Sequence, residues 1–147
     1  MRIIKKEYDK NYFENDFYKE KLESQRNRNR LKELIRHKKS GKLLEVGSGE
    51  GNFLHEAQKQ FDIEGIEFSE YATNNARKIL GDKVSRGNIQ NVNLQSAYYD
   101  VIVVFNLLEH LMEPMKIINK LSYALKEDGI LIGDRKSTRL NSSHVSQ

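Results

Sequence analysis

Three glycines in an alternating pattern interrupt the sequence directly after a short apolar run. They are Gly47, Gly49 and Gly51. Because glycine has no Cβ, a backbone built on it can turn sharply and approach a ligand closely. A helical pattern follows, and the free N–H groups at the start of a helix attract negatively charged or polar ligand groups. The loop, which also contains Ser48, is therefore typical of a nucleotide-type cofactor site, and the acidic Glu45 lies two residues before its first glycine.

A second acidic residue, Glu67, ends the next apolar segment, twenty residues after Gly47. A carboxylate at the end of such a strand can accept hydrogen bonds from both hydroxyls of a ribose. Because strand side chains alternate between the two faces of a sheet, Glu64 is expected to point away from Glu67. Glu67 is thus a candidate ribose ligand beside the glycine loop.

Two further polar segments follow apolar strands. Residues 87–89 read Gly-Asn-Ile, and residues 106–111 read Asn-Leu-Leu-Glu-His-Leu after a mostly β-branched run. An imidazole can serve as a general base on a substrate hydroxyl near neutral pH, which makes His110 a candidate catalytic residue. The alternative is that Glu109 and His110 form local hydrogen bonds that only fix the loop.

Alternating strands and helices must position these residues. Strands are expected over residues 43–46, 63–67, 83–86, 101–105 and 130–132. Helices are expected over residues 52–60, from a cap at Ser69 to residue 80, and over 114–125, with one or two more before residue 40, a loop or short helix over 89–99, and a turn at Asp128-Gly129. This order predicts an α/β fold, a Rossmann-like open and mostly parallel sheet with flanking helices. In such a sheet ligands bind beyond the carboxyl ends of the strands, where all of these polar segments fall.

The glycine loop resembles the first motif of the class I S-adenosylmethionine-dependent methyltransferases. Its pattern is Gly-x-Gly-x-Gly, whereas the dinucleotide pattern requires a glycine at position 52, which is Asn52 here. The segment from Leu108 to Leu111, Leu-Glu-His-Leu, is similar to one in the small-molecule methyltransferases of types 11, 12 and 23. The resemblance covers residues 41–132 and implies S-adenosyl-L-methionine as the cofactor.

The resemblance also implies a role for each residue at the carboxyl edge of the sheet. Backbone N–H groups of the loop would take the carboxylate of the cofactor's amino-acid part, and Glu45 or a carbonyl would take its amine. Glu67 would bind the ribose hydroxyls. Adenine would lie near Phe68 and the segment Asn88-Ile89, with the Asn88 side chain bonding its amino group. The implied reaction is methyl transfer to an oxygen or nitrogen nucleophile of a small-molecule acceptor.

The residue Asn106, which follows the fourth predicted strand, narrows this chemistry. In the family it would lie beside the methionine part of the cofactor. Some relatives carry a metal-binding carboxylate at this place, so we expect no metal site here. Other relatives methylate adenine or glutamine nitrogen with an Asn-Pro-Pro-aromatic tetrad, which is Asn-Leu-Leu-Glu in this sequence and disfavours that activity.

Composition and charge exclude several other functions. The 147 residues contain no cysteine, so disulfides and thiolate chemistry are excluded. No apolar stretch approaches the roughly 18 residues that a membrane span requires, and we expect a cytoplasmic protein. The run Arg26–Arg30 is interpreted as a solvated helix face, and nucleic acid is not the expected partner. Three alternatives stay open: a nicotinamide-dependent oxidoreductase domain, a non-catalytic cofactor-binding module and an RNA methyltransferase that uses the basic face.

The sequence divides into three parts. Residues 1–40 are expected to form a helical lid over the substrate side, and residues 41–133 the cofactor-binding domain. From Asp134 to His144 the sequence matches, codon by codon, the translation of a common short-read sequencing adapter, so residues 134–147 are interpreted as an adapter-derived tail without ordered contacts. Without the three basic residues and one acidic residue of this tail, the net charge falls from +4 to +2. We therefore expect a gene truncated after the fifth strand, without the sixth and seventh strands of the family.

Overall fold

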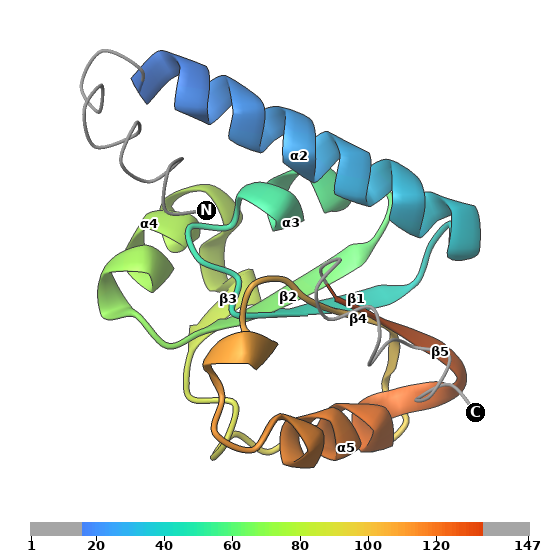
Figure 1. The fold of residues 1–147 in the computed structure, drawn as a ribbon. Helices are drawn as coiled ribbons and strands as arrows, with labels where there is room; N and C mark the ends of the chain where they lie inside the picture. Colours follow the sequence, from blue (N-terminus) through green and yellow to red (C-terminus); the bar gives the residue numbers. More distant parts are fainter. Residues whose placement is uncertain (1–15, 134–147) are drawn as a thin grey trace.

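A computed structural model describes residues 16–133 of the chain as a single parallel sheet with helices on both faces (Figure 1). The five strands are β1 (Lys42–Val46), β2 (Asp62–Glu67), β3 (Val84–Arg86), β4 (Tyr99–Val104) and β5 (Leu125–Gly133). They lie in the order β3-β2-β1-β4-β5, and every neighbouring pair is parallel. The predicted Rossmann-like α/β fold is confirmed, and the expectations for residues 1–15 and 134–147 lie outside the described residues.

The helices form a layer on each side of this sheet. Their bounds are α2 (Asp16–His37), α3 (Asn52–Ala57), α4 (Glu70–Leu80) and α5 (Pro114–Ala124), with short 3-10 turns at Gly81–Lys83 and Leu108–His110. In Figure 1, α2 crosses above α3 and lies on the same side of the sheet as α3 and α4, whereas α5 covers the opposite side. Within the described residues, no helix has the length and apolar content needed to cross a membrane.

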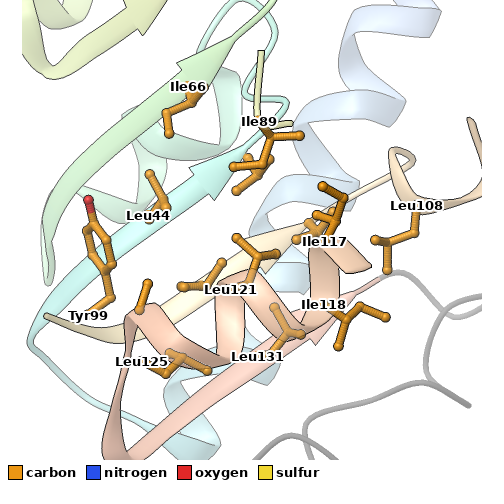
Figure 2. Close-up of a cluster of buried hydrophobic side chains, with 14 residues drawn as sticks. Leu44, Ile66, Ile89, Tyr99, Leu108, Ile117, Ile118, Leu121, Leu125 and Leu131 are labelled. Carbon is orange, nitrogen blue, oxygen red and sulfur yellow. The ribbon is translucent and has the colours of Figure 1, made fainter. Parts of the chain in front are cut away.

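Two apolar clusters hold the layers together. On the α2 side, buried side chains of the helices, among them Leu34 and Leu54, pack with Leu43 of β1. On the α5 side, Leu121 packs with Leu44, the next residue of β1 (Figure 2). Successive strand residues point to opposite faces, so the continuous apolar runs of β1 and β4 fill both clusters, as expected for a covered parallel strand.

The last strand differs most from the sequence prediction. It begins at Leu125, directly after α5, and contains the expected turn as an irregularity: Tyr99 pairs with Leu125, but Val101 pairs with Ile130. A Cβ on Gly129 would lie 2.9–3.1 Å from atoms of Leu125, Lys126 and Tyr99. The glycine therefore permits a bulge inside β5, where the Asp-Gly pattern predicted a turn outside it.

The capping signals around α4 are confirmed. The Ser69 side chain accepts a hydrogen bond from the Ala72 N–H (3.2 Å), and the helix ends at Gly81 with a φ of +65°. The helix expected over residues 52–60 is shorter and ends at Ala57. These elements fix where the glycine loop and Glu67 lie at the carboxyl edge of the sheet.

Candidate functional site at the carboxyl edge of the sheet

The glycine loop connects β1 to α3 and lies against the end of β2. The N–H groups of Gly47 and Ser48 both donate to the Ile66 carbonyl, at 2.8 and 3.2 Å. Gly49 adopts a φ of +58°, and a Cβ built on it would have no heavy atom within 4 Å. Gly51 also has a positive φ, +85°, but a Cβ there would lie 2.7 Å from Leu80 of α4. Gly51 thus serves helix packing, whereas Gly49 borders open space.

Glu67 forms a clamp between the loop and α4. Its Oε1 accepts the Gly49 N–H and its Oε2 accepts the Ser69 N–H, both at 2.8 Å. An ionised carboxylate offers about four lone-pair sites, so two remain for further donors. The structure therefore brings Glu67 and the glycine loop together, as the sequence prediction required.

Two cavities open beside this clamp, and Gly47, Glu67 and Leu107 line both of them. The first cavity, of about 280 Å³, is lined mainly by residues after β2, β3 and β4. The second, of about 350 Å³, lies between the glycine loop, the end of β4 and α2. The shared residues make them two compartments of one cleft.

The first compartment is mainly apolar. Phe68 is exposed at its rim, and Ile89 is buried in its wall. The Ile89 carbonyl accepts a hydrogen bond from the Lys120 ammonium of α5 at 2.7 Å, which fixes this wall. The Asn88 Oδ1 accepts the Gln90 N–H at 2.9 Å and keeps a second lone pair. Phe68, Asn88 and Ile89, predicted to surround adenine, therefore do line one compartment.

The second compartment is polar. Glu45 lines it with only 4% of its surface exposed, and Asn106 lies at the end of β4 with a φ of +57°. Such a left-handed conformation is uncommon outside glycine but tolerated by asparagine. The Ser48 hydroxyl is buried against Gly65 of β2 and has no hydrogen-bond partner among the described residues. Ser48 therefore contributes its backbone to the loop, while its hydroxyl faces the sheet.

Helix α2 supplies residues that the sequence prediction missed. Glu23, Asn27 and Arg30 line the second compartment. The interpretation of the basic run as a solvated face is wrong for Asn27, which is 4% exposed, and for Arg30, whose guanidinium lies 4.1 Å from the centre of the Phe105 ring. The missed signal is the spacing of these residues with Leu34, because positions three and four apart share one helix face.

The structure places His110 in the first compartment. Its side chain is 71% exposed, and its Nε2 lies 3.7 Å from the Glu109 Oε1. The second compartment contains Asn106 but does not contain His110. This position is compatible both with a base that reaches into the cleft and with the local pairing of Glu109 and His110.

The donors and acceptors of the cleft fit an adenosyl group with an amino-acid tail. The first compartment offers apolar surface and an amide for a base, and Glu67 at the junction offers a carboxylate for ribose hydroxyls. The second offers charged groups of both signs, among them Glu45 and Arg30, as a zwitterion requires.

Solved structures share this fold. An S-adenosylmethionine-dependent methyltransferase from Mesorhizobium loti has a TM-score of 0.64 and 17% identity, covering 71% of this chain and 50% of that one. A methyltransferase from Thermotoga maritima has a TM-score of 0.63 and 23% identity, and the match covers 85% of this chain and 58% of that one. A protein from Pyrococcus horikoshii has a TM-score of 0.66 and 18% identity, and the match covers 84% of this chain and 61% of that one. These identities establish the fold alone.

The chain spans about half the length of the first solved proteins that it matches, covering 48%, 58% and 48% of them. Comparison with curated proteins finds no match. A family model for a methyltransferase domain, type 23, matches residues 15–141. This range includes α2 and every strand, and it extends into the segment interpreted as an adapter-derived tail, which stays a prediction. Because the match spans most of the chain, the protein belongs to this methyltransferase-domain family.

Proposed function

We propose that the protein binds S-adenosyl-L-methionine in this cleft and transfers its methyl group to an oxygen or nitrogen nucleophile of a small-molecule acceptor. The observation that carries the proposal is the junction of the two compartments, where the Glu67 carboxylate and the glycine loop are joined by a 2.8 Å hydrogen bond. The family match and the shared fold support the same cofactor class.

Each compartment takes one end of the cofactor in this proposal. The Glu67 carboxylate accepts the ribose hydroxyls while it holds Gly49 and Ser69. The amide of Asn88 and the side chain of Ile89 contact adenine, and Phe68 covers it from the rim. Glu45 and Asn106 contact the amino-acid part in the second compartment.

When bound here, S-adenosyl-L-methionine would supply a sulfonium methyl group: the acceptor nucleophile would bond to its carbon, and the carbon–sulfur bonding electrons would stay on sulfur. The protein's own contribution is to hold the two reactants in line, which alone lowers such barriers substantially. Because the Nε2 of His110 faces Glu109, its Nδ1 is the atom that we assign to take up the acceptor proton.

The basic run of α2 supports the choice of a small-molecule acceptor in this proposal. Arg30 turns into the cleft and Asn27 is buried, so the surface available to a polyanion is smaller than the sequence indicates. This observation favours a small-molecule acceptor over RNA. RNA binding would be steeply dependent on salt, so RNA affinity that is weak and constant with salt is the expected result.

Calorimetric titration of the chain with S-adenosylhomocysteine and, separately, with NAD⁺ tests the proposal. We expect saturable binding of S-adenosylhomocysteine in the micromolar range, typical of metabolite sites, and no saturable binding of NAD⁺. The reverse preference would identify the nicotinamide alternative and refute the proposal.

A second measurement tests the role of His110. The variant His110→Ala should lower the rate of methyl transfer by about 100-fold, the low end for loss of a general base, and leave the affinity for S-adenosylhomocysteine unchanged. If the affinity falls and the rate at saturation does not, His110 is a wall of the adenine compartment and not a base.

A further inference from the structure

We infer that Lys120 of α5 is a positioning residue that orients the Asn88 amide through one peptide group, so that the first compartment distinguishes adenine from other bases. The inference rests on the proposed function, in which Asn88 and Ile89 contact the base. It starts from the 2.7 Å hydrogen bond that the Lys120 ammonium donates to the Ile89 carbonyl.

Two chain segments supply much of the lining of the first compartment. One is residues 87–90, which follow β3, and the other contains Leu107, His110 and Leu111, which follow β4. The second segment leads almost directly into α5, which begins at Pro114. The first segment is far from α5 in the sequence, so only tertiary contacts can fix its position relative to the second.

Ile89 makes these contacts with α5 through both its side chain and its carbonyl. The side chain lies in the buried cluster that also contains Ile117 and Leu121 of α5 (Figure 2). Apolar packing has no preferred direction, so it holds Ile89 against the helix without fixing the rotation of its peptide group. The hydrogen bond from Lys120 supplies that direction, and a charged donor makes it stronger than a bond between neutral groups.

The peptide group held by Lys120 also holds the side chain of Asn88. The Ile89 carbonyl and the Gln90 N–H belong to the same planar unit. Lys120 binds its oxygen at 2.7 Å, and its N–H donates to the Asn88 Oδ1 at 2.9 Å. Hydrogen bonds in such a chain polarise and strengthen one another. Lys120 is therefore connected to the Asn88 amide through a single rigid group.

This connection matters because the Asn88 amide is the group that we assign to the base. With one lone pair of Oδ1 on the Gln90 N–H, the other can accept the amino group of adenine. Without Lys120, the buried Ile89 would have a carbonyl that lacks its donor, which is costly. The peptide would rotate toward another donor, and the Asn88 amide would lose its fixed orientation.

The test compares two ligands that differ only in the base. S-Adenosylhomocysteine has an amino group at C6, whereas S-inosylhomocysteine has a carbonyl there and a proton on N1. Both are titrated by calorimetry into the full chain and into the variant Lys120→Met, which keeps an unbranched apolar stem. We expect the unaltered chain to prefer S-adenosylhomocysteine by at least about tenfold and the variant by less than about threefold.

Two further variants control for charge and chemistry. Lys116→Met removes the same charge one turn earlier on α5, where the exposed Lys116 pairs with Glu113 at 3.8 Å, and should leave the tenfold preference unchanged. Lys120→Arg keeps a cationic donor and should restore part of the preference that Lys120→Met loses. Urea denaturation of each variant checks that the chain is folded during the titrations.

The outcomes separate this inference from the proposed function. If the unaltered chain binds neither ligand, the proposed function is wrong and the inference with it. If it binds S-adenosylhomocysteine, the proposed function stands, and the inference is overturned by any of three results: no preference between the two ligands, an unchanged preference in Lys120→Met, or an equal loss of preference in Lys116→Met. Loss of preference at Lys120 that is absent at Lys116 and partly restored by arginine supports the inference.

Discussion

At each edge of the sheet, a carboxylate accepts a backbone N–H from another chain segment, but the surroundings of the two contacts differ. At the carboxyl edge, Glu67 accepts the N–H of Gly49 from the loop after β1. At the amino edge, Asp100 of β4 accepts the Lys42 N–H of β1 at 2.8 Å, next to Gly41. Each carboxylate joins two chain segments through a backbone N–H, which belongs to a glycine with a positive φ at the carboxyl edge and to the residue after such a glycine at the amino edge.

The two contacts differ in the space around the glycine. A Cβ on Gly41 would lie 2.5 Å from the Asp100 Oδ2, whereas a Cβ on Gly49 would meet nothing within 4 Å. The Lys126 ammonium also contacts Asp100 at 3.2 Å, while Glu67 borders both cavities of the cleft. The closed contact, between Asp100 and Lys42, stabilises the fold. The open contact, between Glu67 and Gly49, leaves its carboxylate accessible to a ligand. A carboxylate bound to backbone N–H groups is therefore not evidence of a binding site unless space remains beside it.

Substitution of Gly41 should have the largest effect, because it disrupts the closed contact between Asp100 and Lys42. Gly41→Ala should lower the free energy of unfolding by about 3 kcal/mol, because a Cβ clashes with Asp100 and φ is +126°. Urea denaturation measures this loss, with Gly81→Ala as a control. Gly81 also has a positive φ but open space around it, so about 1 kcal/mol is expected there. Equal losses at both positions would show that the contact with Asp100 is unimportant.

Substitution of Glu67 should affect the ligand more than the fold. Glu67→Gln removes the charge and one acceptor, so the affinity for S-adenosylhomocysteine should fall about 30-fold, or about 2 kcal/mol. The free energy of unfolding should fall by about 1 kcal/mol, because one backbone N–H then faces an amide NH₂. Calorimetry and urea denaturation on the same preparation give both values. An unchanged affinity would remove Glu67 from the proposed site.

Substitution of Asp100 should affect the stability of the fold more than the affinity for the ligand. Partial burial alone would raise its pKa, but hydrogen bonds from the Lys42 N–H and the Lys126 ammonium outweigh this and hold the pKa of Asp100 below its ordinary value. Asp100→Asn should therefore cost about 1–2 kcal/mol of unfolding free energy and leave ligand affinity unchanged.

The pH dependence of this loss has a definite sign. Because the pKa is lowered in the folded state, the stabilisation is present above the ordinary carboxyl pKa of about 4 and disappears as the pH falls through the folded value. Denaturation between pH 7 and pH 3 should show the difference between the chain and Asp100→Asn shrinking toward acid. A constant difference would contradict the assigned contacts.

The smallest expected effect on stability is that of substituting Gly49, at the open contact. Gly49→Ala places a methyl group in empty space at a φ of +58°, so unfolding should become easier by only about 1 kcal/mol. Calorimetry should nevertheless find weaker binding of S-adenosylhomocysteine, because the methyl group occupies part of the cleft. Unaltered binding would place the ligand away from Gly49.

The sequence predicted the parts of the site that depend on strand ends. Glu67 and Asn88 follow β2 and β3 in a parallel sheet, and topology alone brings such positions to one edge. The sequence did not predict the partners of the loop N–H groups, because the Ile66 carbonyl comes within their reach only when β2 pairs with β1. The position of Arg30 in the wall of the cleft was missed for a similar reason, since a charged run on a helix does not reveal which side packs on the sheet.

The last strand illustrates a local signal overridden by packing. Asp128-Gly129 predicted a turn, and the backbone there does deviate, but Leu125 already pairs with Tyr99. The strand therefore continues through the deviation as a bulge, and glycine fits there because a Cβ would lie too close to Leu125, Lys126 and Tyr99. Pairing with β4 decided the outcome, and no sequence pattern within residues 125–133 contains that information.

A crystal structure of the chain grown with S-adenosylhomocysteine tests the central claim most directly. The predicted result has the ribose hydroxyls on the Glu67 carboxylate, the base between Phe68 and Ile89, and the amino-acid end in the compartment beneath α2. Density for the ligand at any place away from the carboxyl edge, or with the ribose turned from Glu67, would contradict the account.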